Sequence, residues 1–244
     1  MGKKIQLEIN VPTRLSDVPF GQYQKYMEVL QGIDEKTEEA SEFLSLKSLE
    51  IFCGLKLSDV YSIPMKYFDE YLNQIAEVLT EDTPLVHRFW FKGSNGEEVE
   101  FGMIPDIQNI SFGEHIDVEN NILDWKSAHK AMAVLFRPIV AQRKDMYEIE
   151  PYDASGKYDE YMKHMPTSVA LGAILFFYRL GMKLSKHMIA SSLKQMDPKQ
   201  RSAAEKMFSD KSGVGINQFM LSLEETYSSL MKLPANHLRN ALHG

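Results

Sequence analysis

The stretch LVHRFWFKGSNGEEVEFGMI, residues 85–104, constrains the fold more than any other part of the chain. Two strand-like segments flank Ser94, Asn95 and Gly96, and Asn-Gly is a strong signal for a tight turn between paired strands. The sequence therefore predicts a β-hairpin over residues 85–104, embedded in a chain whose other segments are mainly helical.

This hairpin carries three consecutive aromatic residues, Phe89, Trp90 and Phe91. Successive side chains of a strand point to opposite faces, so bulky groups lie on both faces, and a two-stranded ribbon cannot bury both by itself. We expect one face to pack on the helical body. The other face, at Trp90 or its neighbours Phe89 and Phe91, is expected to meet another chain.

Apolar residues at steps of three or four predict three helices before the hairpin. Ser16 is the expected N-cap of the first helix, and Gly32 is its expected end. The second helix spans about residues 38–53, and the third follows Pro64. The residues expected on the inner sides are Phe20, Tyr23, Met27, Leu30, Phe43, Leu46, Leu49, Phe52, Phe68, Leu72, Ile75 and Leu79.

Helical spacing also dominates the second half of the chain. Ser111 and Glu114 match a capping box, and the helical pattern that follows runs to Arg137, with a break expected near Asn120 and Asn121. Further helices are expected at residues 158–164, 167–183, 198–208 and 216–232.

Strands are expected in two more places. Ile5, Leu7 and Ile9 alternate with polar residues, which predicts an N-terminal strand, and a weaker signal indicates a second strand pair at residues 139–152. The fold class is therefore mainly α (α+β), a helical body with an N-terminal strand and one or two small β-hairpins. No repeat or long linker divides residues 1–244, so we expect a single helical domain.

The segment DWKSAHKAMAVLFRPI, residues 124–139, brings an acid, a serine, a histidine and an arginine onto one predicted helix. Ser127 and His129 are two positions apart, and such positions face different directions, so a local Ser-His-Asp triad is excluded. His129 is expected to be a structural, hydrogen-bonding residue; the remote alternative is a hydrolase in which His129 or His115 works with a distant acid. Arg137 is expected to bind last-turn carbonyls or a nearby acid and to be structural.

Composition narrows the function classes further. The net charge is −7 without any block of Lys or Arg, so no specific nucleic acid is expected as a partner. The seven histidines do not form the i,i+4 pair of a metalloprotease helix, and no nucleotide-binding glycine motif is present, so neither metal nor cofactor is expected. The single cysteine, Cys53, lies in an apolar run and is expected to be a buried small hydrophobe in an intracellular protein.

No membrane association is expected either. The N-terminal MGKKIQLEIN lacks the apolar core of a signal peptide. The most apolar run, VALGAILFFY at residues 169–178, is ten residues long, whereas a spanning helix needs about 20. This run is expected to be a buried core helix.

Residues 198–244 are expected to form a C-terminal helical segment that contributes to oligomerisation. Its helix at residues 216–232 carries a broad apolar face, and Glu224, Glu225, Ser228 and Ser229 mark the wet side. The alternative is that helices 167–183 and 198–208 bury this face within the subunit. The interface candidates on it are Phe219, Met220, Leu223, Tyr227, Leu230 and Met231.

Six segments in the first 180 residues or so resemble, in the same order, small structural or assembly proteins of tailed bacteriophages, particularly crAss-like and other short-tailed phages. They are LSDVPFGQYQKYMEVL (15–30), FLSLKSLEIFCGL (43–55), FGMIPDIQNISFGEHIDVEN (101–120), DWKSAHKAMAVLFRPI (124–139), YEIEPYDA (147–154) and MPTSVALGAILFFYRLG (165–181).

This resemblance implies a non-enzymatic protein that acts through protein contacts, and it transfers no functional residue. It implies a virion component, assembled in the cytoplasm of the bacterial host. The expected role is a ring or adaptor subunit between portal and tail, in a homo-oligomeric ring that contacts other portal, neck and tail proteins. The alternative is a tail assembly chaperone that is absent from the mature particle.

Overall fold

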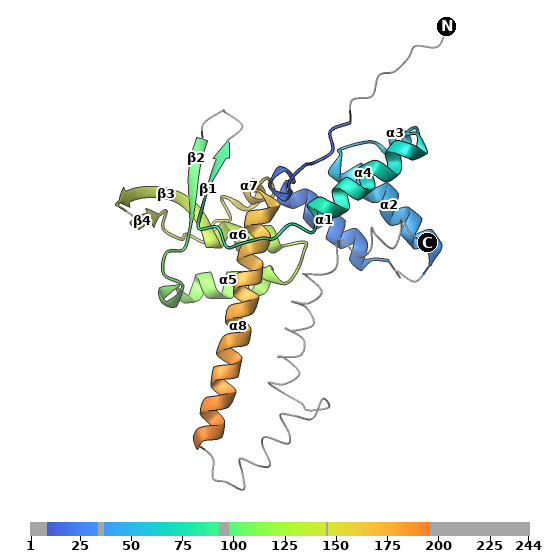
Figure 1. The fold of residues 1–244 in the computed structure, drawn as a ribbon. Helices are drawn as coiled ribbons and strands as arrows, with labels where there is room; N and C mark the ends of the chain where they lie inside the picture. Colours follow the sequence, from blue (N-terminus) through green and yellow to red (C-terminus); the bar gives the residue numbers. More distant parts are fainter. Residues whose placement is uncertain (1–8, 34–36, 93–97, 145, 196–244) are drawn as a thin grey trace. The chain divides into compact units, whose positions relative to one another are not determined.

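The computed structural model describes residues 9–33, 37–92, 98–144 and 146–195, and these residues form an α+β fold (Figure 1). They fall into two compact units whose boundary lies within the last described helix, between Gly172 and Ala173. Residues 5–8 of the predicted N-terminal strand lie outside the described residues, and Ile9, which is described, is in no strand. The predicted helices 198–208 and 216–232 also lie outside the described residues.

Four helices come before the sheet. They are α1 (Phe20–Gln31), α2 (Glu38–Phe52), the short α3 (Leu57–Val60) and α4 (Met65–Val78). The predicted helices are confirmed, and Gly32 is the C-cap of α1. Two details were wrong. Ser16 lies inside the 3-10 turn η1 (Leu15–Asp17), so Pro19 is the N-cap of α1, and Phe43 is 44% exposed, because α2 instead buries Leu44 and Leu49.

Four strands make one antiparallel sheet in the order β1-β2-β3-β4. They are β1 (Arg88–Lys92), β2 (Glu98–Met103), β3 (Phe136–Arg143) and β4 (Met146–Ile149). The predicted hairpin is β1–β2, with Arg88 opposite Gly102, and the weaker predicted pair is β3–β4. Pairing of Met103 with Phe136 joins the two hairpins into one sheet.

Between β2 and β3 lie the turn η2 (Ile107–Asn109), α5 (Phe112–Ile122) and α6 (Ala128–Leu135). The predicted break is confirmed, although it falls a few residues later than Asn121. The predicted helix end at Arg137 is wrong, because the helix ends at Leu135 and Phe136 and Arg137 begin β3. The helical spacing of apolar residues continues past Leu135 in the sequence, but these residues lie in strand β3.

The inner face of the sheet forms part of the core. Phe89 stacks on Phe101 and meets Phe136 edge-on, with ring centroids 5.7 and 5.5 Å apart. Tyr158, which precedes the short helix α7 (Asp159–Met162), packs edge-on against Phe101. Burial of these rings fixes which face of the sheet points inward.

The helix α8 (Thr167–Gln195) begins where the prediction placed it and is twelve residues longer than the predicted 167–183. Its start is held by the N-terminal segment, since the Thr167 hydroxyl donates to the Val18 carbonyl over 2.7 Å. Close approach requires glycine at Gly172, because a Cβ there would lie 2.4 Å from the Pro84 carbonyl oxygen. Among the described helices, none is long and apolar enough to cross a bilayer.

Candidate functional site

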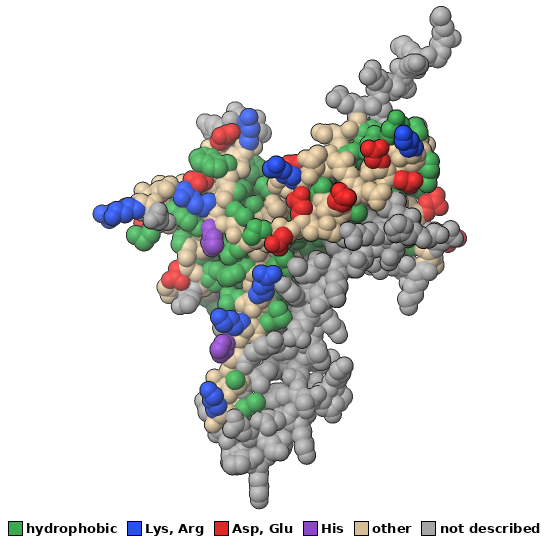
Figure 2. All heavy atoms as spheres, in the orientation of Figure 1, with side chains coloured by type: hydrophobic (Ala, Val, Ile, Leu, Met, Phe, Trp, Pro, Cys, Tyr) green, Lys and Arg blue, Asp and Glu red, His purple; other side chains and the backbone are tan. Residues whose placement is uncertain are grey.

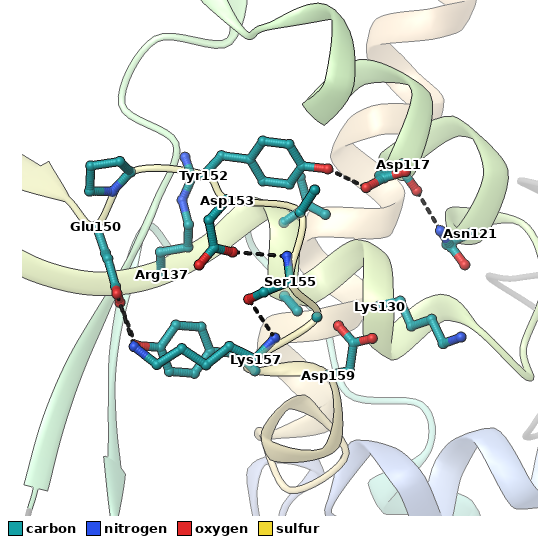
Figure 3. Close-up of a pocket in the computed structure, with 16 residues that line it drawn as sticks. Asp117, Asn121, Lys130, Arg137, Glu150, Tyr152, Asp153, Ser155, Lys157 and Asp159 are labelled. Atoms are coloured by element: carbon teal, nitrogen blue, oxygen red, sulfur yellow. Dashed lines mark hydrogen bonds and ion pairs between the residues drawn. The ribbon is translucent and has the colours of Figure 1, made fainter.

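A polar cavity of about 240 Å³ opens between α5, α6 and the segment that links β4 to α7 (Figure 3). Its lining combines both signs of charge. The charged lining residues are Asp117, Lys130, Arg137, Glu150, Asp153, Lys157 and Asp159.

Glu114 and Arg137 form a buried ion pair beside this cavity. Ser111 caps α5, so Glu114 stands one turn into the helix, and its Oε2 accepts from the Ser111 backbone N–H over 2.7 Å. Its Oε1 accepts from Arg137 Nη2, also over 2.7 Å, and both residues are 7% exposed. Burial alone would raise the pKa of Glu114, but the hydrogen bonds from Ser111 and Arg137 together hold it below its usual value.

The rest of the Arg137 guanidinium lacks such partners. Nε and Nη1 are buried and have no hydrogen-bond partner among the described residues, although Arg137 lines the cavity. The ring of Tyr152 lies over the guanidinium, with its centroid 5.8 Å from Cζ, a cation–π arrangement. Two guanidinium nitrogens are thus buried donors that the described part of the fold leaves unpaired.

Tyr152 is itself fixed from two directions. Its hydroxyl donates to Asp117 on α5, as Figure 3 shows, and that bond raises the pKa of Tyr152 to about 12. A Cβ at Gly113 would lie 3.1 Å from the Tyr152 ring, so the ring packs closely on the first turn of α5. Tyr152 therefore covers Arg137 in a defined position.

The segment between β4 and α7 closes the cavity on the remaining side. Asp153 accepts from the Ser155 backbone N–H over 2.9 Å, and Gly156 has a φ of 65°, which favours glycine. Lys157 Nζ donates to Glu150 over 2.9 Å, and Tyr158 donates to the same carboxylate. The cavity walls therefore hold carboxylates that already have their own donors.

A second surface lies on the sheet around Trp90. Phe89 and Phe91 are 7% and 9% exposed, whereas Trp90 is 63% exposed. The predicted packing of one hairpin face on the body is thus confirmed. That Trp90 meets another chain stays a prediction. A shallow hollow of about 400 Å³ is lined by Trp90, Val99, Glu100 and Val140, among others.

Arg88 forms hydrogen bonds with polar side chains next to this hollow. Arg88 binds Glu100 through two nitrogens at 2.9 Å each, and its Nη2 also donates to Gln142 over 2.8 Å. Its guanidinium lies 5.3 Å from the centroid of the Tyr147 ring. Figure 2 shows hydrophobic side chains at the surface beside β1 and β2, with charged side chains between them.

His129 lies apart from both surfaces and is 4% exposed. The Gln24 amide nitrogen has only hydrogens to offer, so at 3.1 Å it must donate to His129 Nδ1, and it also donates to the Trp125 carbonyl. The predicted hydrogen bonding of His129 is confirmed, and the structure adds that the residue is buried. Burial first, then nearby Lys163, lowers the pKa of His129.

The other predicted residues fall in different places. Arg137 does bind a nearby acid, as predicted. Cys53 is half-buried, and burial raises the pKa of its thiol to about 11. The C-terminal interface candidates Phe219, Met220, Leu223, Tyr227, Leu230 and Met231 lie outside the described residues. Within the described ranges, no group of three or more His, Cys, Asp or Glu side chains is placed to hold a metal ion.

Sequence reasoning missed the cavity. The Ser111–Glu114 capping box did locate one of its neighbours, but Arg137 and Tyr152 come from separate segments with no periodic relation. The polar run EPYDASGKYD, residues 150–159, was the available signal.

Comparisons of this chain with protein-family models, curated proteins and solved structures find no match.

Proposed function

We propose that this chain is a non-enzymatic virion component of a tailed bacteriophage, a ring or adaptor subunit of the neck or tail. It acts through contacts with portal, neck and tail proteins and with further copies of itself in a homo-oligomeric ring. The proposal rests on the segment resemblance and, in the structure, on one observation, the exposure of Trp90 above a shallow hollow of the sheet.

The chemistry of this hollow suits a protein contact. Tryptophan buries a large area at little conformational cost and is enriched among residues that dominate binding energy. Trp90 is 63% exposed, and Val99 and Val140, which also line the hollow, are 37% and 60% exposed. The Arg88–Glu100 pair provides a polar margin, so the patch has the apolar centre and charged rim of an interface.

The placement of His129 supports a non-enzymatic role over the hydrolase alternative. Its Nδ1 is engaged by the Gln24 amide, and the ring is 4% exposed. A histidine that acts as a general base must reach the proton that it removes from substrate. His115, by contrast, is exposed and lies 3.6 Å from Glu119 on the same helix, which is an ordinary surface pair.

The test is carried out in a phage that encodes the chain, by deletion and complementation. Wild type, Trp90→Ala and Tyr61→Ala are compared, since Tyr61 is an aromatic residue of similar exposure, 67%, after α3. We expect the chain in fixed stoichiometry in purified particles with wild type and Tyr61→Ala, and its loss with Trp90→Ala.

Two other outcomes decide against parts of the proposal. If the chain is needed for tails but absent from particles, the tail assembly chaperone replaces the ring subunit. If deletion leaves particle yield and composition unchanged, the phage role itself is wrong.

A further inference from the structure

The two outer strands of the sheet leave backbone groups unpaired. In the order β1-β2-β3-β4, no described strand lies on the far side of β1 or of β4, so each has an open edge (Figure 1). Successive residues of a strand direct their N–H and C=O groups to opposite sides. The hydrogen bonds inside the sheet therefore identify the groups that point outward.

On β1 the outward groups belong to Arg88 and Trp90. The Met103 N–H donates to the His87 carbonyl over 2.8 Å, so His87 is directed towards β2, and by alternation Phe89 is too. Arg88 and Trp90 direct their N–H and C=O groups away from β2. Within the described ranges, these groups have no hydrogen-bond partner.

On β4 the outward groups belong to Tyr147 and Ile149. The Glu150 N–H donates to the Pro138 carbonyl of β3 over 2.9 Å, and Glu148 also pairs with β3. The alternating residues Tyr147 and Ile149 therefore direct their backbone groups away from β3. In the described part of the chain, these groups also lack a hydrogen-bond partner.

The two open edges are compatible in direction and in face. All neighbouring strands are antiparallel, so β4 runs opposite to β1. The Arg88 guanidinium lies 5.3 Å from the centroid of the Tyr147 ring, so both side chains lie on the same face, and by alternation Trp90 and Ile149 share it. A second copy can therefore add its β4 to β1 as an antiparallel strand without turning the sheet over.

We propose that the β1 edge of one copy pairs with the β4 edge of a second copy, with Trp90 opposite the partner's Tyr147. Arg88 then lies opposite the partner's Ile149, and about four backbone hydrogen bonds join the two residue pairs. This contact rests on the proposed homo-oligomeric ring and specifies how its subunits meet. It is heterologous, so each added copy leaves one open β1 and one open β4 until the ring closes.

Charge favours this pairing over pairing of β1 with a second β1. A twofold arrangement centred on Trp90 would set Arg88 opposite the partner's Lys92, and like charges directly opposite each other destabilise a strand pair. The outward residues of β4, Tyr147 and Ile149, are uncharged. The two cations of β1 therefore disfavour its own copy and accept β4.

Exposed side chains also gain cover in this register. Trp90, which is 63% exposed, forms a cross-strand aromatic pair with the partner's Tyr147. Met146 lies on the opposite face of β4 and is 72% exposed. It is placed opposite Phe91 of the neighbouring copy, so the aromatic inner face continues from one subunit to the next.

The experiment blocks one edge at a time in the full chain and measures the native mass. Trp90→Pro removes an outward N–H and keeps the bonds of β1 to β2, since proline is tolerated where the N–H points away from a sheet. Ile149→Pro blocks β4 in the same way. We expect an oligomer with wild type, a monomer with each variant alone, and a dimer in an equimolar mixture, because each variant keeps one open edge.

Alanine variants are the matched controls. Trp90→Ala and Ile149→Ala lose the side chain but keep the N–H, so their dissociation constants should stay at least about tenfold below those of the proline variants. Equal association of the alanine and proline variants would show that side chains alone make the contact, and it would overturn the proposal.

The other outcomes are also decisive. A dimer of Ile149→Pro alone indicates pairing of two β1 edges, and a dimer of Trp90→Pro alone indicates pairing of two β4 edges; both overturn the proposal. A full oligomer with either variant overturns the edge contact and leaves the ring to another surface. A monomeric wild type at every concentration overturns the edge contact as well. The phage role is decided separately, by the composition of purified particles.

A measurement on the wild type keeps the test decisive if the proline variants do not fold. Amide hydrogen exchange is followed while the protein concentration is raised. The outward N–H groups of Trp90 and Ile149 should gain protection as the oligomer forms, whereas the Phe89 N–H, which points to β2, should be protected throughout. Unchanged exchange at Trp90 and Ile149 in the oligomer overturns the proposal.

Discussion

At the scale of single residues, Glu114 illustrates how one side chain serves two structures. One oxygen accepts from the Ser111 backbone at the start of α5, and the other accepts from Arg137 on β3. A helix cap is thereby coupled to a strand, because the same carboxylate must be charged and correctly placed for both bonds.

Removal of one partner of this pair should be costly. Arg137→Ala leaves the Glu114 carboxylate buried without a counterion, so the free energy of unfolding should fall by about 3–5 kcal/mol. Urea unfolding near neutral pH measures this value. Arg143→Ala, an exposed arginine at the end of β3, is the control and should change little.

The pair should also produce acid sensitivity. The pKa of Glu114 in the fold lies below its usual value of 4.5, so its contribution is present above that value. It is lost as the pH falls through the folded pKa, because the unfolded chain binds the proton more readily. The wild type should therefore lose more stability than Glu114→Gln over about pH 5 to 3. Parallel acid titrations of the two proteins would contradict this.

His129 should make the stability of the protein depend on pH at higher pH values than Glu114 does. Its pKa is lowered from 6.5, first by burial and then by Lys163, although Glu160 and Asp159 oppose the shift. The unfolded chain therefore takes up the proton first, and stability should fall as the pH drops below about 6.5. His129→Asn offers Gln24 an acceptor that does not titrate. Urea unfolding should show a weaker pH dependence in that variant, and equal slopes would refute the assignment.

At the scale of elements, strand β1 buries alternate residues as predicted, whereas the segment from α6 to β3 does not follow its predicted helical pattern. Phe136 stands in helical register with Met132 and is fully buried, but it lies on a strand that pairs with Met103. In the strand, the backbone groups after Leu135 form hydrogen bonds with β2; in a longer α6 they would form hydrogen bonds within the helix. Both arrangements satisfy the backbone, so the local spacing of apolar residues could not distinguish a helix from a strand here.

The two faces of β1 should respond differently to truncation. Phe89→Ala removes a ring packed on Phe101 and Phe136, so stability should fall by about 3–5 kcal/mol. Trp90→Ala removes an exposed ring, and a change within about 0.5 kcal/mol is expected. Chemical unfolding of both variants gives the comparison, and a large loss with Trp90→Ala would show that Trp90 is a core residue instead.

The start of α8 depends on a close approach. In Gly172→Ala the new Cβ would lie 2.4 Å from the Pro84 carbonyl, so overpacking of about 1–3 kcal/mol should outweigh the helix propensity gained. Gly32→Ala is the matched control, because its nearest atom lies at 3.5 Å and its φ is −85°. Melting temperatures should drop only for Gly172→Ala. A stabilised Gly172→Ala would mean that α8 can move away from Pro84.

At the scale of the whole molecule, the proposed function rests on two predicted contact surfaces. The structure describes only one of them. Trp90 is exposed on the described sheet, whereas the C-terminal candidates from Phe219 to Met231 lie outside the described residues. The single-domain expectation and the oligomeric role of residues 198–244 stay predictions.

Truncation tests the C-terminal segment directly. A chain that ends after Gly213 should stay folded and form an oligomer of fewer copies than the full chain, because the apolar face of the helix predicted at 216–232 is removed. Circular dichroism and native mass are measured together. In the full chain, Glu224→Gln/Glu225→Gln on the wet side should leave the mass unchanged. A folded truncation product that still forms the full oligomer contradicts the role, and an unfolded one supports burial of that face within the subunit.

What the sequence by itself determined are features set by neighbours a few positions apart. The capping box of Ser111 and Glu114, the end of α1 at Gly32 and the alternation that buries Phe89 and Phe91 all depend on local geometry. Such patterns are visible in one stretch of chain, because the interacting groups are adjacent in it.

Only the tertiary structure decided how these pieces meet. The switch to a strand at Phe136 depends on the hydrogen bonds offered by β2, and the cavity depends on Glu114, Arg137 and Tyr152 arriving from α5, β3 and the segment after β4. No spacing rule relates these three residues. Their charges and hydrogen bonds acquire meaning only when packing removes water and fixes their distances.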